Sequence, residues 1–157
     1  MASARFGEVR LHVDAPPDVV WSLLADLDRM GEWSPECYKV SWLDGASSPA
    51  QVGARFKGWN RWGPVRWSMT CEVKTAEPGR EVSWSTVQGG RDVVGWRYLL
   101  EPAGAGTDVI ESFHVAWLPS MARLFEDVII VNRDRQREHA MRATLERIKS
   151  AVEAPSM

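Results

Sequence analysis

The chain has 157 residues, of which 45 % are hydrophobic and 25 % charged, and this balance predicts one globular domain spanning residues 1–157. A formal net charge of −2 gives no overall basic field of the kind that favours nucleic-acid binding. No stretch approaches the ~20 consecutive apolar residues of a membrane helix, and no signal-like apolar run opens the chain, so we expect a cytoplasmic protein.

The amino-terminal part of the chain predicts a strand followed by two short helices. Residues 6–14 alternate between apolar and polar side chains, which is typical of a strand with one face in water. We expect a helix that is capped by Asp14 or Ala15 and runs to about Ala25. A second helical turn should follow and end at Gly31, before a loop.

The middle of the chain predicts strands and turns only. Alternating segments are separated by turns rich in glycine and proline, and these hairpin-length connections indicate an antiparallel meander. The expected strands are 38–42, 54–59, 65–74, 82–86, 94–101 and 107–115.

The carboxy-terminal part, residues 119–152, predicts a long helix because no proline or glycine interrupts it. Its apolar stripe contains Met141, Leu145, Ile148 and Val152. The same stripe followed backwards passes through Glu138, Asp134, Val131 and Asp127, so we expect it to become acidic over a wet region or a pocket. A kink near 132–138, or a short helix followed by a long one, would accommodate this change.

These elements predict an α+β fold in which a curved seven-stranded antiparallel sheet wraps around the long helix. Two short helices after the first strand would close one end and leave a cavity. Nine tryptophans, mostly in the strand region, are suited to lining such a cavity, because indole rings are apolar and still carry an N–H donor. The alternative for each inward aromatic side chain is a solidly packed core.

The chain resembles the polyketide cyclase/dehydrase-like members of the START-like, or SRPBCC, superfamily, which includes the birch pollen allergen. The resemblance begins with Ala15-Pro16-x-x-Val19-x-Trp21-x-x-Leu24-x-Asp26 and Trp33-x-Pro35. It continues through Gly53-x-x-Phe56, Trp96-x-Tyr98-x-Leu100-Glu101-Pro102, Gly106-Thr107 and Thr144-Leu145-x-x-Ile148-Lys149. It implies the helix-grip fold and functions ranging from binding of hydrophobic ligands to cyclisation and chaperone assistance. Fold alone selects none of these.

Strand alternation places a set of side chains on the expected inner face, and the long helix adds others. Trp33 is expected instead to be a structural plug for the short helices. The predicted ligand-binding residues are Phe56, Asn60, Trp67, Met69, Trp84, Trp96, Tyr98, Glu111, Phe113, Val131, Asp134 and Glu138.

Glu111 has the same strand parity as Val109 and Phe113, so its carboxylate should point inward. An isolated buried carboxylate must pair, find donors or become protonated. One hypothesis places it near the sheet edge, in contact with water or an arginine. The other makes it the polar anchor of the cavity or an acid/base catalyst, with Arg135 and Arg137 as partners and with Asp134 and Glu138 raising its pKa.

Several surface features also bear on function. Basic residues alternate with aromatic side chains in residues 55–67, which predicts either a solvated hairpin or transient membrane contact through Trp59 and Trp62.

The three histidines do not come together, so no metal site is expected. Cys37 and Cys71 have opposite parities and should be free thiols. No nucleotide-binding or nucleophile motif appears, and we expect no cofactor.

The favoured function is binding or carriage of a small hydrophobic or aromatic molecule in the cavity. The alternatives are an aromatase/cyclase or dehydratase-type enzyme and a chaperone-activator-like interaction module. Whether the chain catalyses a reaction, and its oligomeric state, stay open at this point.

Overall fold

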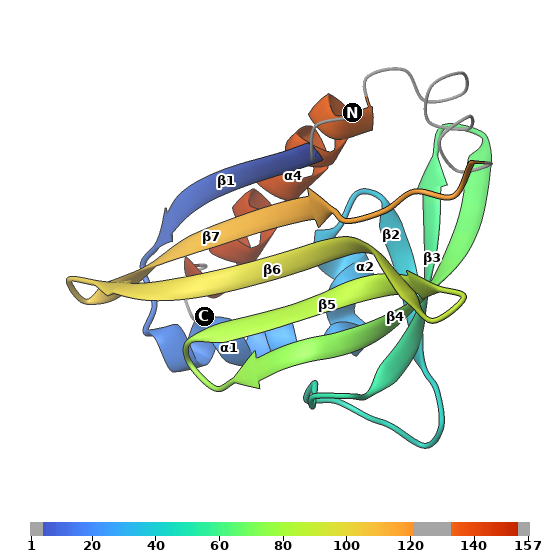
Figure 1. Ribbon diagram of the computed structural model, residues 1–157. Helices are drawn as coiled ribbons and strands as arrows, with labels where there is room; N and C mark the ends of the chain where they lie inside the picture. The colour runs from blue at the N-terminus through green and yellow to red at the C-terminus, as the bar shows by residue number, and fades with distance from the viewer. Residues whose placement is uncertain (1–4, 121–132, 154–157) are drawn as a thin grey trace.

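The computed structural model describes residues 5–120 and 133–153, in which seven antiparallel strands form one sheet (Figure 1). The order across the sheet is β1-β7-β6-β5-β4-β3-β2, so the first strand pairs with the last and the others form a meander. This arrangement confirms the predicted sheet. The strands are β1 (Arg5–Val13), β2 (Cys37–Trp42), β3 (Arg55–Trp62), β4 (Val65–Glu77), β5 (Glu81–Gln88), β6 (Arg91–Ala103) and β7 (Gly106–Val115).

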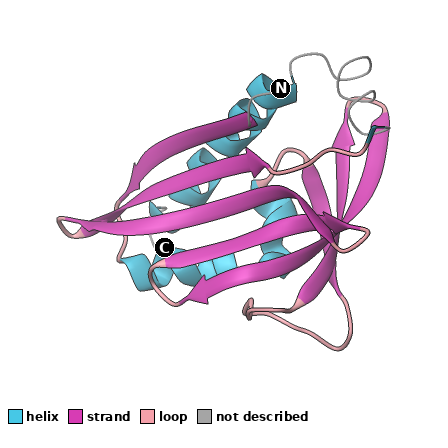
Figure 2. Cartoon of the chain, in the orientation of Figure 1, coloured by secondary structure: helices cyan, strands magenta, loops and turns pink. Residues whose placement is uncertain are grey.

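The helices lie on one face of the sheet, behind the strands in the view of Figures 1 and 2. They are α1 (Pro17–Ala25), the short 3₁₀ helix η1 (Leu27–Arg29), α2 (Met30–Trp33) and the long helix α4 (Arg133–Glu153). None of the described helices is long and apolar enough to cross a membrane.

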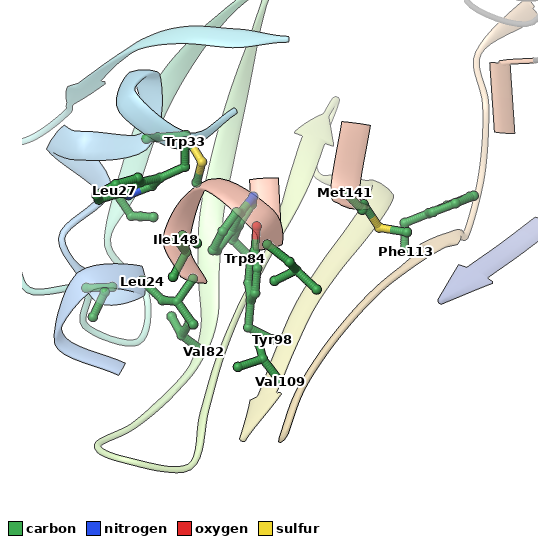
Figure 3. Packing of buried hydrophobic residues seen from close by; sticks show 14 of the residues in the cluster. Leu24, Leu27, Trp33, Val82, Trp84, Tyr98, Val109, Phe113, Met141 and Ile148 are labelled. Atoms are coloured by element: carbon green, nitrogen blue, oxygen red, sulfur yellow. The ribbon is translucent and has the colours of Figure 1, made fainter. Parts of the chain in front are cut away.

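The strand alternation predicted from the sequence matches the burial in the structure. All five inward residues of β7 are buried, from Thr107 through Val109, Glu111 and Phe113 to Val115. A one-sided antiparallel sheet must cover such a face, and α4 does so with Met141, Leu145 and Ile148, each no more than 2 % exposed. The carboxy-terminal half of the long helix is therefore packed in a dry core, as expected (Figure 3).

The start of α1 differs from the sequence prediction. The N-cap is Pro16 rather than Asp14 or Ala15, and no side chain caps the helix. Asp14 is instead engaged outside the helix, where its carboxylate contacts the imidazole of His12 at 3.1 Å. Because proline fixes φ near the helical value and has no N–H to satisfy, the helix begins at Pro17 without a polar cap.

The second helical turn also extends further than predicted. Gly31 lies inside α2, which continues to Trp33, so this tryptophan belongs to the helix and not to a loop. A Cβ atom at Gly31 would lie only 2.6 Å from the carbonyl oxygen of Tyr38. Glycine is therefore needed here for the close approach of α2 to β2, and does not end the helix.

Helix α4 is continuous from Arg133 to Glu153, so the expected kink is absent from the described part of the 132–138 region. The prediction of a separate short helix before it falls on residues 121–132, which lie outside the described residues.

Candidate functional site

A cavity of about 310 Å³ lies between the concave face of the sheet and α4. This volume is at the lower end of the range for small-molecule sites. The sheet supplies most of the wall, and eight of the predicted site residues contribute to it: Phe56, Asn60, Trp67, Met69, Trp84, Trp96, Tyr98 and Glu111.

The aromatic part of the wall is built from rings that pack against one another in two groups. The ring centroids of Phe56 and Trp84 are 5.9 Å apart. Those of Trp84 and Tyr98, which Figure 3 labels, are 5.6 Å apart. The ring centroids of Trp96 and Phe113 are 5.8 Å apart, with the two rings tilted. Such edge and tilted contacts hold each ring in place. The rings therefore form a shaped apolar wall and do not fill the interior.

Helix α4 contributes a basic stripe to the cavity wall, not the acidic one expected. Arg133, Arg137 and Met141 all line the cavity and are at most 7 % exposed. The predicted stripe stepped back from Met141 by three residues to Glu138 and then by four to Asp134. The buried face steps back by four residues each time, to Arg137 and then to Arg133. The sequence also allows the spacing of four, but it places arginines on the buried face, and arginine is rarely buried unless it is paired.

Each arginine of this stripe is held by a carboxylate. The guanidinium of Arg133 makes a two-point ion pair with Glu36 and lies 5.5 Å from the ring centroid of Trp67. Arg137 donates to Asp134 at 2.8 Å, and Arg5 from β1 makes a second two-point contact with the same carboxylate. Burial raises the pKa of Asp134, but the two arginines outweigh it and lower that pKa overall.

Three of the predicted site residues have other positions, and a fourth lies outside the described residues. Asp134 is at the end of the helix beside Arg5, and Glu138 is exposed, so neither belongs to the described cavity wall. Phe113 is 1 % exposed and supports the wall from behind through Trp96. Val131 lies outside the described residues.

Glu111 is buried in the wall and is 3 % exposed. Its Oε2 atom has no hydrogen-bond partner among the described residues. Burial raises the pKa of its carboxyl group to about 8, and a hydrogen bond with the hydroxyl of Tyr98 opposes that shift only in part. The hypothesis that placed Glu111 near the sheet edge, in contact with water or an arginine, is therefore wrong, because the carboxyl group is buried and no arginine is among the causes of its pKa shift.

None of the four charged residues that the sequence predicts around Glu111 is among the causes of its raised pKa. Arg135 is exposed, and the causes of the raised pKa include neither Asp134 nor Glu138. Arg137 lies in the cavity wall, but its guanidinium is directed at the Phe113 ring and Asp134.

The two cysteines both face the cavity, although opposite parities were expected. A register shift between Cys37 and Lys39 in the β2–β3 ladder reverses the side-chain direction of Cys37, which sequence alternation does not reveal. Both are free thiols. Burial raises the pKa of Cys37 to about 11 and also raises that of Cys71, so both remain protonated near neutral pH.

The basic and aromatic residues of segment 55–67 divide between the two faces of the sheet, because Phe56 and Trp67 line the cavity whereas Trp59 and Trp62 do not. Lys39 and Lys57 both lie over the ring of Trp59, at 4.7 and 5.0 Å from its centroid. Trp62 is 40 % exposed near the end of β3. Membrane contact through these two tryptophans stays a prediction. Within the described residues, no group of three or more His, Cys, Asp or Glu side chains is placed to hold a metal ion.

The fold and its internal cavity define a START-like, helix-grip protein. A family model described as polyketide cyclase / dehydrase and lipid transport matches residues 7–153, and the chain belongs to that family. A search of curated proteins found no match.

Solved structures of other proteins share this fold, and one of them is a polyketide-cyclase-like protein. The polyketide-cyclase-like protein Cgl2372 of Corynebacterium glutamicum is 30 % identical, with 98 % of this chain and 92 % of that chain covered and a TM-score of 0.59. Major latex-like protein 151 of Panax ginseng is 10 % identical, with coverages of 97 % and 99 % and a TM-score of 0.72. The latter shows the shared fold alone.

Proposed function

We propose that the protein binds or carries a small hydrophobic or aromatic molecule in the cavity between its sheet and α4. The observation that carries this proposal is the cavity itself, which stays open although its wall is built from large, mutually packed aromatic side chains. A protein that used these rings only for stability would be expected to close them into a solid core. The family described as polyketide cyclase / dehydrase and lipid transport is consistent with this function.

An aromatase/cyclase or dehydratase-type activity is the second candidate, and Glu111 is the observation that favours it. A buried carboxyl group with a raised pKa is the form that a general acid takes. The cavity wall contains one other described carboxylate, Glu36, which is engaged with Arg133. Glu111 therefore lacks a nearby carboxylate partner for two-group proton transfer, and binding or carriage is the better-supported function.

Filling the cavity from Gly58 should weaken ligand binding strongly. Gly58 is buried in β3 and lines the cavity, and a Cβ atom there would meet only the Sγ atom of Cys37, at 3.6 Å. The Gly58→Ile side chain should therefore grow into the cavity without a backbone collision. We expect wild type to bind a fluorescent apolar probe with a dissociation constant of about 1 µM or tighter, and Gly58→Ile to bind it at least about tenfold more weakly.

Gly95→Ile is the matched control, because it adds the same side chain to a strand of the same sheet. A Cβ atom at Gly95 would lie 3.6 Å from the hydroxyl of Ser85, outside the cavity wall. This variant should bind the probe like wild type. Equal probe affinity in wild type and Gly58→Ile, or no binding of several probes by wild type, would contradict the proposal and favour an interaction module.

A further inference from the structure

Glu111 is the polar group that the aromatic wall of the cavity leaves unexplained. It lies at the middle of β7, opposite Val9 of β1 and Tyr98 of β6. Its same-face neighbours on β7 are Val109 and Phe113, so its surroundings within the sheet are apolar except for the Tyr98 hydroxyl. The Oε2 atom of Glu111 therefore lacks the hydrogen-bond partner that buried polar atoms normally have.

The other charged and titratable groups that line the cavity come from the sheet, from α4 and from the segment before β2. They are Cys37, Cys71, Tyr98, Arg133, Arg137 and Glu36. Burial raises the pKa values of Tyr98 and the two cysteines, so these three are neutral near pH 7. Arg137 is engaged with Asp134, and Arg133 is engaged with Glu36. The described residues thus give Glu111 no ion-pair partner.

We propose that Glu111 is the recognition group of the cavity, and that it donates a hydrogen bond to an uncharged ligand oxygen, of the ketone or phenol type, on an apolar or aromatic body. This inference rests on the proposed function and specifies its ligand class. Burial favours the protonated carboxyl group, which has one O–H donor. Glu111 lines the cavity, and its buried Oε2 atom has no hydrogen-bond partner among the described residues.

The same environment disfavours a charged ligand at this position. An amine would have to ionise Glu111 and form a buried ion pair, whose desolvation cost offsets its Coulomb attraction. A carboxylate ligand would bring a further negative charge into a cavity whose two lining arginines, Arg133 and Arg137, are already engaged with Glu36 and Asp134. An uncharged acceptor pairs with the acid without moving a charge into the interior, and the apolar rings on either side accommodate the rest of the molecule.

The test compares two probes of the same shape, 2-acetylnaphthalene and 2-ethylnaphthalene, which differ in one carbonyl oxygen. At pH 6 wild type should bind the ketone about tenfold more tightly, as expected for one buried hydrogen bond. In Glu111→Leu this ratio should fall to about one. Glu111→Gln keeps an N–H donor and should retain most of the preference.

The pH dependence gives a second readout. In wild type the preference for the ketone should be present below the pKa of about 8 and decline above it, because the ionised carboxylate has no proton to donate. Glu111→Gln should show no such decline. Thermal unfolding of each variant provides the check that it is folded.

The possible failures are distinguishable. If both probes bind with the same ratio in wild type and Glu111→Leu, the inference is overturned while the proposed function stands. Tighter binding of 2-naphthylmethylamine than of either probe, lost in Glu111→Gln, would also overturn it in favour of a cationic ligand. If neither naphthalene binds to wild type, the proposed function and the inference fail together.

Discussion

Replacing Glu111 with glutamine should stabilise the protein relative to wild type, and increasingly so as the pH rises from 5 to 8. Burial raises the pKa of this carboxyl group from 4.5 to about 8 in the folded state. The folded protein therefore binds the proton more tightly than the unfolded chain does. The contribution of Glu111 to stability is fully present below about pH 4.5 and is lost as the pH rises through 8.

The expected stability difference between wild type and Glu111→Gln follows from the same linkage between proton binding and folding. Each pH unit between the two pKa values changes the free energy of unfolding by about 1.4 kcal/mol, so wild type should lose roughly 3–4 kcal/mol relative to Glu111→Gln over this range. Urea unfolding of both proteins at several pH values measures the difference. Glu8→Gln, at an exposed position of β1, controls for loss of a carboxylate. A difference between wild type and Glu111→Gln that does not change with pH would show that Glu111 is not buried as a neutral acid.

A side chain that costs this much stability near neutral pH needs a reason to be in the interior. Natural proteins retain such groups where activity requires them, because stability and function compete at binding and catalytic sites. Phe113 and Val109 show that the same face of β7 accepts purely apolar side chains. If unfolding measurements give this cost, it would support a functional role for the cavity.

Phe113→Ala should destabilise the protein by about 3–5 kcal/mol, which is the usual cost of truncating a fully buried aromatic side chain. Phe113 is 1 % exposed and contacts Trp96 and the guanidinium of Arg137. Its ring also lies over Gly7, its cross-strand partner, where a Cβ atom would be 2.9 Å from the Cζ atom of Phe113. Glycine at position 7 therefore makes room for the ring.

A double-mutant cycle with Gly7→Val tests that relationship. In wild type the valine must displace the Phe113 ring, and we expect a cost of about 1–3 kcal/mol. In the Phe113→Ala background the ring is gone and only the flexible carboxylate of Glu138, 2.9 Å from the Cβ position, must move, so the same substitution should cost at least about 1 kcal/mol less. Denaturant unfolding of the four proteins gives the coupling energy. Strictly additive effects would mean that Gly7 and Phe113 do not pack as the structure places them.

The sheet could be predicted from the sequence because each strand has one wet face and one dry face. The alternation of β7, for example, placed Val109, Glu111 and Phe113 on the buried side, and the structure does the same. Cys37 shows where this reasoning fails, because a single irregular residue in a ladder reverses the face of every side chain beyond it. Nothing in the local sequence marks that irregularity.

The helical side of the cavity was harder to predict than the sheet side. Hydrophobic periodicity locates Met141, Leu145 and Ile148, but it gives no information on a buried face made of arginine. Arg133 is buried because Glu36 pairs with it from a segment 97 residues away along the chain. Such pairing depends on tertiary contact, so the basic stripe could be recognised only in the structure.

The most direct test of a ligand-binding cavity is to locate a bound probe by the methionine methyl groups. The three methionines of the described residues, Met30, Met69 and Met141, all line the cavity, from α2, β4 and α4. In protein labelled with ¹³C at the methionine methyls, titration with 2-acetylnaphthalene should shift these three resonances together and give intermolecular nuclear Overhauser effects to the naphthalene ring. Gly58→Ile should suppress both. Binding of the probe with no change at Met30, Met69 and Met141 would contradict the account.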